Sequence, residues 1–363
     1  MKNNFFILAG TILLISCVNI NDRINKDVEN SRYFQFIYEV EIEPTNGKKV
    51  ELWIPVPQSN EVQSISNLEY DFSGLNYQLK TEKAHNNKYL YIYSYNGISD
   101  TTTFKMSFNV SRKEHNNVNY KNIVPDNYLT SYSQVSVGDI FSNIINDNNL
   151  NRDDIKGIYD FVLNGMHYGK PKDSNIDDIY YSSKNPNTNE DWLPDEEKFG
   201  RFAVSKDEVV NIYKESKKMN TKYTFGNGNS LYACDIGVGN CTDFHSYFMS
   251  LGRTLEIPIR FHMGFLISNE SQGQVGGYHC WADYYVDSQG WYPVDISEAD
   301  KDPSREEYFF GTICNNRVDF MIGRDFIIDN YEEESVNLFI YPLYEVDDQK
   351  SEVYTKKFKY KNL

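Results

Sequence analysis

The hydrophobic pattern of this chain changes from a helical to a strand period at Ile257-Pro258, and this change most constrains the fold. Before it, apolar residues recur at helical spacing, at Phe244, Phe248, Leu251 and Leu255. The proline ends the helix because it disfavours the helical conformation of the preceding residue. Strand-like runs follow at 259–266, 279–286 and 291–296. A helix followed by an antiparallel sheet predicts an α+β fold.

The region before this core has the alternating pattern of β-strands. Apolar and polar residues alternate from Tyr33 to Ile42, and Asn46-Gly47 is typical of a tight turn. Further strand-like runs lie at 50–55, 89–93 and 102–110. Short strands at this spacing predict an antiparallel β-sandwich. We place the sandwich domain at residues 33–116 and a second domain at residues 117–363.

Two more helices are expected ahead of the α+β core. Asn151 is a candidate N-cap, with Asp153 and Asp154 in the first turn and an apolar helical face behind them. Ser205 opens the second helix. Residues 171–200, between the two helices, are rich in Asn, Asp, Ser and Pro. This composition predicts a long loop, a candidate lid or cleft wall.

The charge of the chain argues against one class of partner. The chain has 363 residues, more than one compact domain usually needs, and a formal net charge of -16. Proteins that bind a phosphate backbone carry basic surfaces, so no nucleic-acid partner is expected. The 29 Tyr and 22 Phe favour strands rich in aromatic residues.

The first residues have the features of an export signal. The apolar run from Phe5 to Ile15 follows a lysine and is too short to span a bilayer as a mature helix. It ends in Leu14-Ile15-Ser16-Cys17, which resembles a bacterial lipobox. We therefore expect a lipoprotein signal at residues 1–17, acylation of Cys17 and a tether at residues 18–32. The protein would be exported and lipid-anchored to the cell envelope; an ordinary secretory signal is the alternative.

Three residues of different chemistry mark a candidate site. Cys241 lies where a glycine-containing turn meets the apolar helix. A helix N-terminus lowers the pKa of a thiol, and the thiolate is the nucleophile. His279 begins one strand-like run, and Asp295 lies near the end of the next. An imidazole beside the thiol completes a thiolate–imidazolium pair, and a carboxylate on its far nitrogen orients the ring. The trio predicts acyl transfer.

The motifs around these residues together resemble the transglutaminase-like superfamily. They are Gly239-Asn240-Cys241-Thr242-Asp243-Phe244-His245-Ser246, Arg253 with Ile257-Pro258-Ile259-Arg260, Tyr278-His279-Cys280-Trp281, and Gly290-Trp291-Tyr292-Pro293-Val294-Asp295. Further stretches, Tyr308-Phe309-Phe310-Gly311 and Asn316-Arg317-Val318, resemble a bacterial exported branch of the family. The resemblance implies a papain-like α+β catalytic core within residues 117–363. It also implies that Cys241 is the nucleophile, His279 the base and Asp295 the orienting carboxylate.

Other residues near the trio have alternative interpretations. His245 follows Cys241 by one helical turn and is a rival base, although it and Asp243 can equally shape the polar side of the helix. Tyr278 and Trp281 are candidate substrate-binding residues, as cleft wall or oxyanion donors. The alternative for both is aromatic packing in the core.

No metal or cofactor is expected. A metal site would combine a cysteine with His245, His279 and Asp283, but these residues lack a recognised ligand spacing. After the signal, one disulfide can join two of Cys234, Cys280 and Cys314, and the sequence does not assign it.

The pairing of the last two strands decides whether His279 and Asp295 meet. Directly facing positions need a hairpin centred on Asp287, whereas the turn Asp287-Ser288-Gln289-Gly290 centres further along. A β-bulge or a diagonal contact would bring the two side chains together.

The expected function is an exported thiol enzyme that acts on amide bonds by Cys-His-Asp acyl transfer, with a protein or peptide as substrate. Hydrolysis is favoured because no sequence feature specifies an amine acceptor. The alternatives are a transamidase that cross-links proteins and a non-catalytic binding module of the cell envelope that uses the same cleft.

Overall fold

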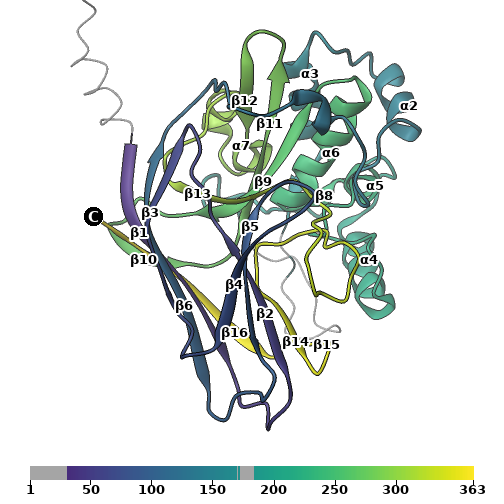
Figure 1. Cartoon of the computed structure of the whole chain (residues 1–363). Coiled ribbons are helices and arrows are strands. Elements are labelled where there is room, and N and C mark those ends of the chain that lie inside the picture. The colour runs from purple at the N-terminus through teal and green to yellow at the C-terminus, as the bar shows by residue number, and fades with distance from the viewer. Residues whose placement is uncertain (1–30, 170, 172–183) are drawn as a thin grey trace, which may run out of the picture.

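The computed structural model describes residues 31–169, 171 and 184–363, and Figure 1 shows their arrangement. The expected signal with Cys17 lies outside these residues, as do most of the tether and much of the expected loop at 171–200. The last two residues of the tether already belong to the first strand. None of the helices in the described ranges combines the length and the apolar character that crossing a bilayer requires.

Two five-stranded antiparallel sheets form the lower part of the molecule in Figure 1. Their strands are β1 (Ser31–Ile42), β2 (Val50–Val56), β3 (Gln63–Asp71), β4 (Asn76–Thr81), β5 (Lys88–Ser94), β6 (Thr102–Lys113), β10 (Gln272–Val275), β14 (Leu343–Val346), β15 (Gln349–Lys350) and β16 (Tyr354–Asn362). One sheet has the order β10-β16-β1-β6-β3, and the other has the order β15-β14-β2-β5-β4. The prediction of an antiparallel β-sandwich is confirmed.

Alternation along the strands builds the core of the sandwich. In β1 every second residue from Phe34 to Ile42 is at most 1% exposed, and the residues between them are mostly half-buried. Alternate side chains of a strand point to opposite faces, so one face of β1 is buried in the core.

The C-terminal strands belong to the sandwich, which is therefore built from both ends of the chain. Strand β16 pairs with β1 from Phe34 opposite Asn362 to Ile42 opposite Tyr354, and β14 pairs with β2. The expected boundary at residue 116 leaves these strands out. Strand β16 carries four lysines, and only Phe358 and Tyr360 are buried in it, so its apolar pattern is too sparse to read from the sequence.

Beside the two sheets of the sandwich lies a four-stranded antiparallel sheet with a helix packed against it. The sheet has strands β9 (Ile259–Leu266), β11 (His279–Val286), β12 (Gly290–Val294) and β13 (Arg317–Ile322). Their order is β12-β11-β9-β13, and helix α6 (Cys241–Thr254) contacts β9 and β11. A side chain at Gly252 would clash with Ile259, so glycine allows the helix to lie close to the sheet. The helix-then-sheet prediction is confirmed.

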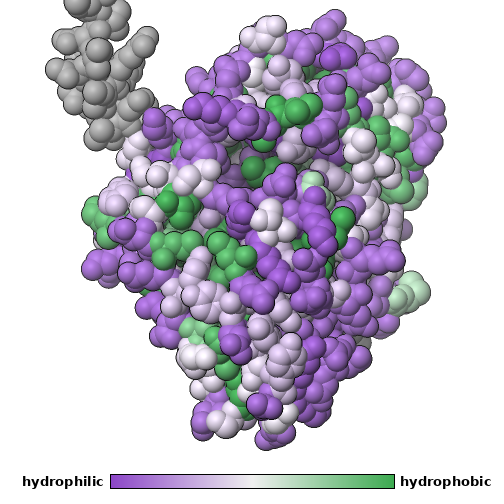
Figure 2. Space-filling view, in the orientation of Figure 1, coloured by the Kyte–Doolittle hydropathy of each residue, from purple (hydrophilic) through white to green (hydrophobic). Residues whose placement is uncertain are grey.

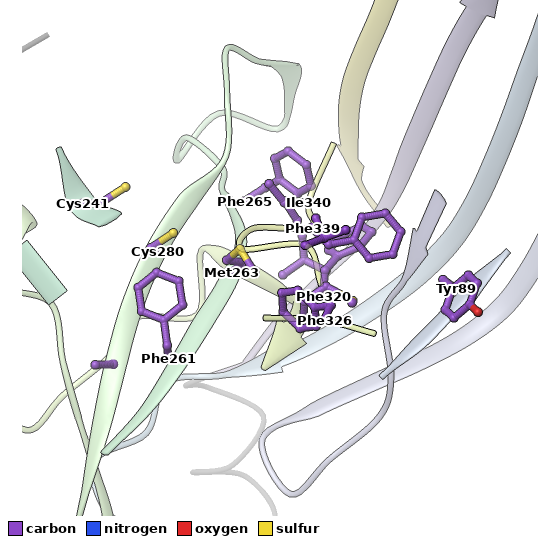
Figure 3. Close-up of a cluster of buried hydrophobic side chains, with 14 of the residues drawn as sticks. Tyr89, Cys241, Phe261, Met263, Phe265, Cys280, Phe320, Phe326, Phe339 and Ile340 are labelled. Atoms are coloured by element: carbon purple, nitrogen blue, oxygen red, sulfur yellow. The ribbon is translucent and has the colours of Figure 1, made fainter. Parts of the chain in front are cut away.

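Aromatic side chains join the four-stranded sheet to the sandwich. The ring of Phe265 in β9 lies 5.2 Å from Phe36, 5.2 Å from Phe320 and 4.4 Å from Phe358, between ring centroids. Figure 3 shows Phe265 and Phe320 within the buried cluster that runs on to Cys241 and Cys280. The sandwich and the four-stranded sheet therefore share one hydrophobic core, and the candidate nucleophile Cys241 lies at its edge.

The remaining elements are η1 (Pro125–Tyr128), α2 (Ile140–Asp147), α3 (Ile155–Gly165), β7 (His167–Tyr168), α4 (Lys206–Met219), α5 (Ser230–Ile236), β8 (Val238–Gly239), α7 (Ile296–Lys301), η3 (Pro303–Arg305) and α8 (Glu306–Phe309). Most of these helices, among them α2, α3 and α5, lie near α6 in Figure 1. Ser205 caps α4 through a capping box with Glu208, as the sequence indicates.

The predicted start of α3 is wrong by one turn. Asp154, not Asn151, is the N-cap, and its side chain accepts a hydrogen bond from the amide of Gly157. The Asn151 side chain instead closes a tighter turn with the amide of Asp153.

Outside the core the molecule is polar: Figure 2 shows a mainly hydrophilic face on which hydrophobic side chains form small separate patches.

Candidate active site

Cys241 is the first residue of α6, where a capping box fixes the start of the helix. The side chain of Asn240 accepts a hydrogen bond from the amide of Thr242 (2.9 Å), and Asp243 accepts one from the amide of Asn240 (3.0 Å). The amide of Cys241 has no acceptor in the described part of the chain. A thiol at this position lies in the positive potential of the helix N-terminus.

His279 and Asp295 meet through a diagonal contact across the β11–β12 hairpin. The pairing runs from Ala282 opposite Val294 to Val286 opposite Gly290, so His279 and Asp295 are two positions out of direct register. Asp295 lies just beyond β12 as the N-cap of α7, and its Oδ2 is 2.6 Å from Nε2 of His279. Of the two contacts that the sequence left open, the diagonal one occurs.

Asp295 is a buried carboxylate that is held by several partners. Arg317 Nη2 lies 2.7 Å from its Oδ2, and both side chains are fully buried. The hydroxyl of Ser297 and the amide of Glu298 each donate to its Oδ1 at 3.0 Å. Burial alone would raise the pKa of Asp295, but the charges of His279 and Arg317 outweigh it and hold the pKa well below the usual range.

The ring of His279 also bonds to the thiol of Cys241. Asp295 occupies Nε2, so the nitrogen that faces the sulfur is Nδ1. Burial favours the neutral ring, but Asp295 and the thiolate outweigh it and raise the pKa of His279 to about 9. Thiolate and imidazolium therefore stabilise each other near neutral pH.

The thiol of Cys280 is a further neighbour of Cys241, and its contact is a finding of the tertiary structure. Cys280 bonds to the sulfur of Cys241, and its own sulfur lies 3.6 Å from the hydroxyl of Thr242. Figure 3 shows the two thiols next to each other. The hydrogen bond from Cys280 is the largest cause that lowers the pKa of Cys241 well below its usual value; burial opposes it and His279 adds to it.

The four cysteines in the described residues are free thiols, so the disulfide considered from the sequence does not form here. Three of them are buried, and Cys314 is half-buried.

The two aromatic residues predicted to bind substrate differ in position. Tyr278 is half-buried beside the nucleophile, with its hydroxyl 3.0 Å from that of Thr242 and its amide bonded to the hydroxyl of Tyr341. Trp281 is 1% exposed and stacks on His262, with 5.5 Å between the ring centroids, so its side chain belongs to the core; its role in substrate binding stays a prediction. Its side chain packs in the core because alternation turns it to the face of β11 opposite α6.

His245, the rival base, and Asp283, a ligand in the metal alternative, both bond to other partners. Both ring nitrogens of His245 bond to backbone groups, at Cys241 and Ile296. Asp283, the carboxylate of the metal alternative, pairs with Arg260 and His262 at 2.9 Å and 3.2 Å instead. It is therefore part of a buried ion-pair network rather than of a site around the thiol.

A loop of positive-φ glycines lies against the start of α6. Asp243 accepts hydrogen bonds from the amides of Gly226 (2.7 Å) and Gly228 (2.9 Å), and Arg324 donates to the carbonyl of Gly228. Asp243 therefore positions this loop, in agreement with its simpler interpretation from the sequence. Arg324 is fully buried, and no local pattern around it indicated this contact.

Lys301 is a cation near the nucleophile that the sequence did not single out. Its Nζ lies 2.7 Å from Glu298 and 4.0 Å from the centroid of the Tyr168 ring. Its charge also acts on Cys241 and favours the thiolate. No pattern around Lys301 predicts this, because the strand and helix that bring Tyr168 and Lys301 together are far apart in the chain.

Comparison with known proteins identifies the segment that holds these residues. Residues 203–296 match the family model of the "Transglutaminase-like superfamily", and this segment contains Cys241, His279 and Asp295. A curated "Uncharacterized protein" of Haemophilus influenzae (strain ATCC 51907 / DSM 11121 / KW20 / Rd) is 30% identical over 194 residues, which are 43% of this chain and 53% of that protein. The chain thus spans about half the length of this relative.

A solved structure of similar extent is that of "a Putative Cysteine Protease from Cytophaga hutchinsonii". It is 12% identical, with a TM-score of 0.47, and the match covers 91% of this chain and 98% of that chain.

Proposed function

The chain carries a transglutaminase-like domain at residues 203–296, and from this premise we propose that it is a thiol enzyme that cleaves amide bonds by acyl transfer. The observation that carries the proposal is that the buried ring of His279 acts on the thiol of Cys241 and is hydrogen-bonded to the carboxylate of Asp295. A binding module has no need of a thiolate, an imidazolium and a buried carboxylate in this order.

The reaction would begin with attack of the Cys241 thiolate on the carbonyl carbon of the amide. The oxyanion that forms would accept a hydrogen bond from the backbone amide of Cys241, which has no acceptor within the described residues. His279 would then protonate the leaving amine, and a thioester would remain on the sulfur. Water, activated by the same ring, would release the acid and restore the thiolate.

Asp295 would keep the ring of His279 oriented through each of these steps. Its bonds to Ser297 and Glu298 and its ion pair with Arg317 leave its carboxylate little freedom. It stays ionised while His279 gains and loses its proton, because its pKa is held well below the usual range.

Alkylation with a fluorescent iodoacetamide tests the nucleophile. Wild type at pH 6 to 7 should label rapidly at Cys241, and a Cys241→Ser protein should lose this fast phase. Cys234→Ser is the matched control, because Cys234 is also buried and burial raises the pKa of its thiol. Equal fast labelling of wild type and Cys241→Ser would rule out the nucleophile. A peptide library analysed by mass spectrometry, with and without an added primary amine, then separates hydrolysis from transamidation.

We further propose that the protein is exported and anchored to the cell envelope through acylated Cys17, as the sequence of residues 1–17 indicates. Metabolic labelling of cells with a fatty-acid analogue tests this. Wild type should incorporate the label and a Cys17→Ser protein should not, and labelling of both would contradict the proposal.

A further inference from the structure

His245 is a fully buried histidine whose two ring nitrogens bond to two different elements. Its Nδ1 lies 2.6 Å from the backbone oxygen of Cys241, one turn earlier in α6. Its Nε2 lies 3.1 Å from the backbone nitrogen of Ile296, the first residue of α7. One partner is the backbone of Cys241, the proposed nucleophile, and the other directly follows Asp295, the orienting carboxylate.

These partners define the state of the ring. A carbonyl oxygen can only accept, so Nδ1 carries the proton and donates it to Cys241. The amide of Ile296 donates, so Nε2 is unprotonated and the ring is neutral. Burial is the largest cause that lowers the pKa of His245, in agreement with a neutral ring.

The bonds connect the backbone at the nucleophile with the backbone at the orienting carboxylate. Cys241 begins α6, and Ile296 follows Asp295, the N-cap of α7. Residues 241 and 296 are far apart in sequence and lie on different elements. The neutral ring of His245 spans from one helix start to the other, in addition to the contact that runs through His279.

We propose that His245 is a positioning residue that sets the spacing between the nucleophile and the orienting carboxylate. This rests on the proposed function above. With His245 in place, Asp295 stays within reach of His279, and His279 stays within reach of the sulfur. Without the bond to Ile296, the start of α7 is free to move away, and the imidazolium that stabilises the thiolate loses its carboxylate.

Charged groups around His245 belong to the same site. Asp295 Oδ1 lies 3.9 Å from Nε2, and the thiol of Cys241 and the ring of His279 also act on it. Asp295 and the thiolate favour a charged ring, whereas burial and His279 oppose it. The amide of Ile296 donates only to the neutral ring, so the hydrogen bond between Ile296 and His245 is present when the ring of His245 is uncharged.

Two half-conservative variants separate the two bonds. The side-chain amide of His245→Asn can reach the position of Nδ1 and keep the bond to Cys241, but not the bond to Ile296. His245→Gln reaches the position of Nε2 and can keep the bond to Ile296. Ser250→Ala is the matched control, because Ser250 is buried in the same helix and its hydroxyl has no partner in the described residues.

The readout is the rate of Cys241 alkylation by iodoacetamide from pH 4 to 10, with the thermal unfolding of each variant. The proposal expects His245→Asn to be alkylated roughly tenfold more slowly at pH 6, the factor that about one buried hydrogen bond is worth, and its profile to move to higher pH. His245→Gln should stay within about threefold of wild type, and Ser250→Ala should match it.

Equal alkylation profiles for folded His245→Asn and wild type would overturn the proposal, as would equal losses in the Asn and Gln variants. If His245→Asn does not fold, hydrogen exchange in wild type and His245→Gln decides. The amide of Ile296 should then be protected in both proteins, and fast exchange there would overturn the proposal. Because Cys241→Ser labelling tests the nucleophile independently of His245, the two ideas fail separately.

Discussion

Asp295→Asn should reduce both stability and activity, and the two losses should be separable by a second substitution. The change keeps the shape of the side chain but removes a negative charge that faces the guanidinium of Arg317. Both side chains are fully buried, with 2.7 Å between Nη2 and Oδ2. Removal of one partner from such a pair costs about 3–5 kcal/mol, because the remaining charge has lost its compensation in a nonpolar site.

The expected catalytic loss is larger than the loss of stability. An amide on the far nitrogen of His279 favours the wrong tautomer and no longer stabilises the imidazolium. In serine proteases, the equivalent change lowers kcat by about 10⁴. The double variant Asp295→Asn, Arg317→Met removes the uncompensated cation as well. It should recover most of the lost stability, while alkylation and amide cleavage stay low.

Urea unfolding midpoints, measured together with the alkylation rate at pH 6, check both parts. Asp287→Asn, in the exposed turn of the same hairpin, is the control and should match wild type in both measurements. Unchanged stability of Asp295→Asn, or a double variant that is less stable than the single one, would refute the view that the ion pair with Arg317 is what the single change disrupts.

Three further results are expected. Amide cleavage needs protonated His279, whose pKa is raised to about 9, so the cleavage rate should fall as the pH rises through 9. Alkylation of Cys241 needs only the thiolate, so its rate should not fall in this range. A parallel fall of both rates would contradict this assignment. Cys280→Ala removes the hydrogen bond that most lowers the pKa of Cys241, so alkylation of Cys241 should slow at acidic pH and match wild type at pH 10. An alkylation rate that is unchanged at acidic pH would contradict this role of Cys280. Gly228→Ala adds a Cβ 2.7 Å from Nη1 of Arg324 at a residue whose φ is +63°. In urea titrations it should lower the free energy of unfolding by about 1–3 kcal/mol. An unchanged free energy of unfolding would mean that the loop is free to shift.

Patterns within a few residues were sufficient for several parts of the fold. Strands β9 and β11 have the bounds expected from their apolar runs, and α6 begins at Cys241. Each of these features depends on local chemistry: the period of the side chains, the cap at Asn240, and the proline that prevents helix beyond Ile257.

Other parts depended on pairing between distant segments. Strand β16 joins β1 across more than three hundred residues, and its lysine-rich sequence gives no sign of it. Trp281 lies two positions from His279 and shares its face of β11, with 6.4 Å between the two ring centroids, yet it is buried in the core against His262. Alternation predicts which side chains share a face of a strand, but the packing of distant segments decides whether that face is exposed.

The sequence by itself determined which side chains could carry the chemistry and which elements hold them, because a capped helix start and two strand runs are set by nearby residues. The tertiary structure alone decided that Cys280, Arg317 and His245 surround the Cys241–His279–Asp295 series. Those contacts depend on strand register and on where α7 lies against α6. A shift of one residue in a strand would turn each of its side chains to the opposite face, and no local pattern fixes that register.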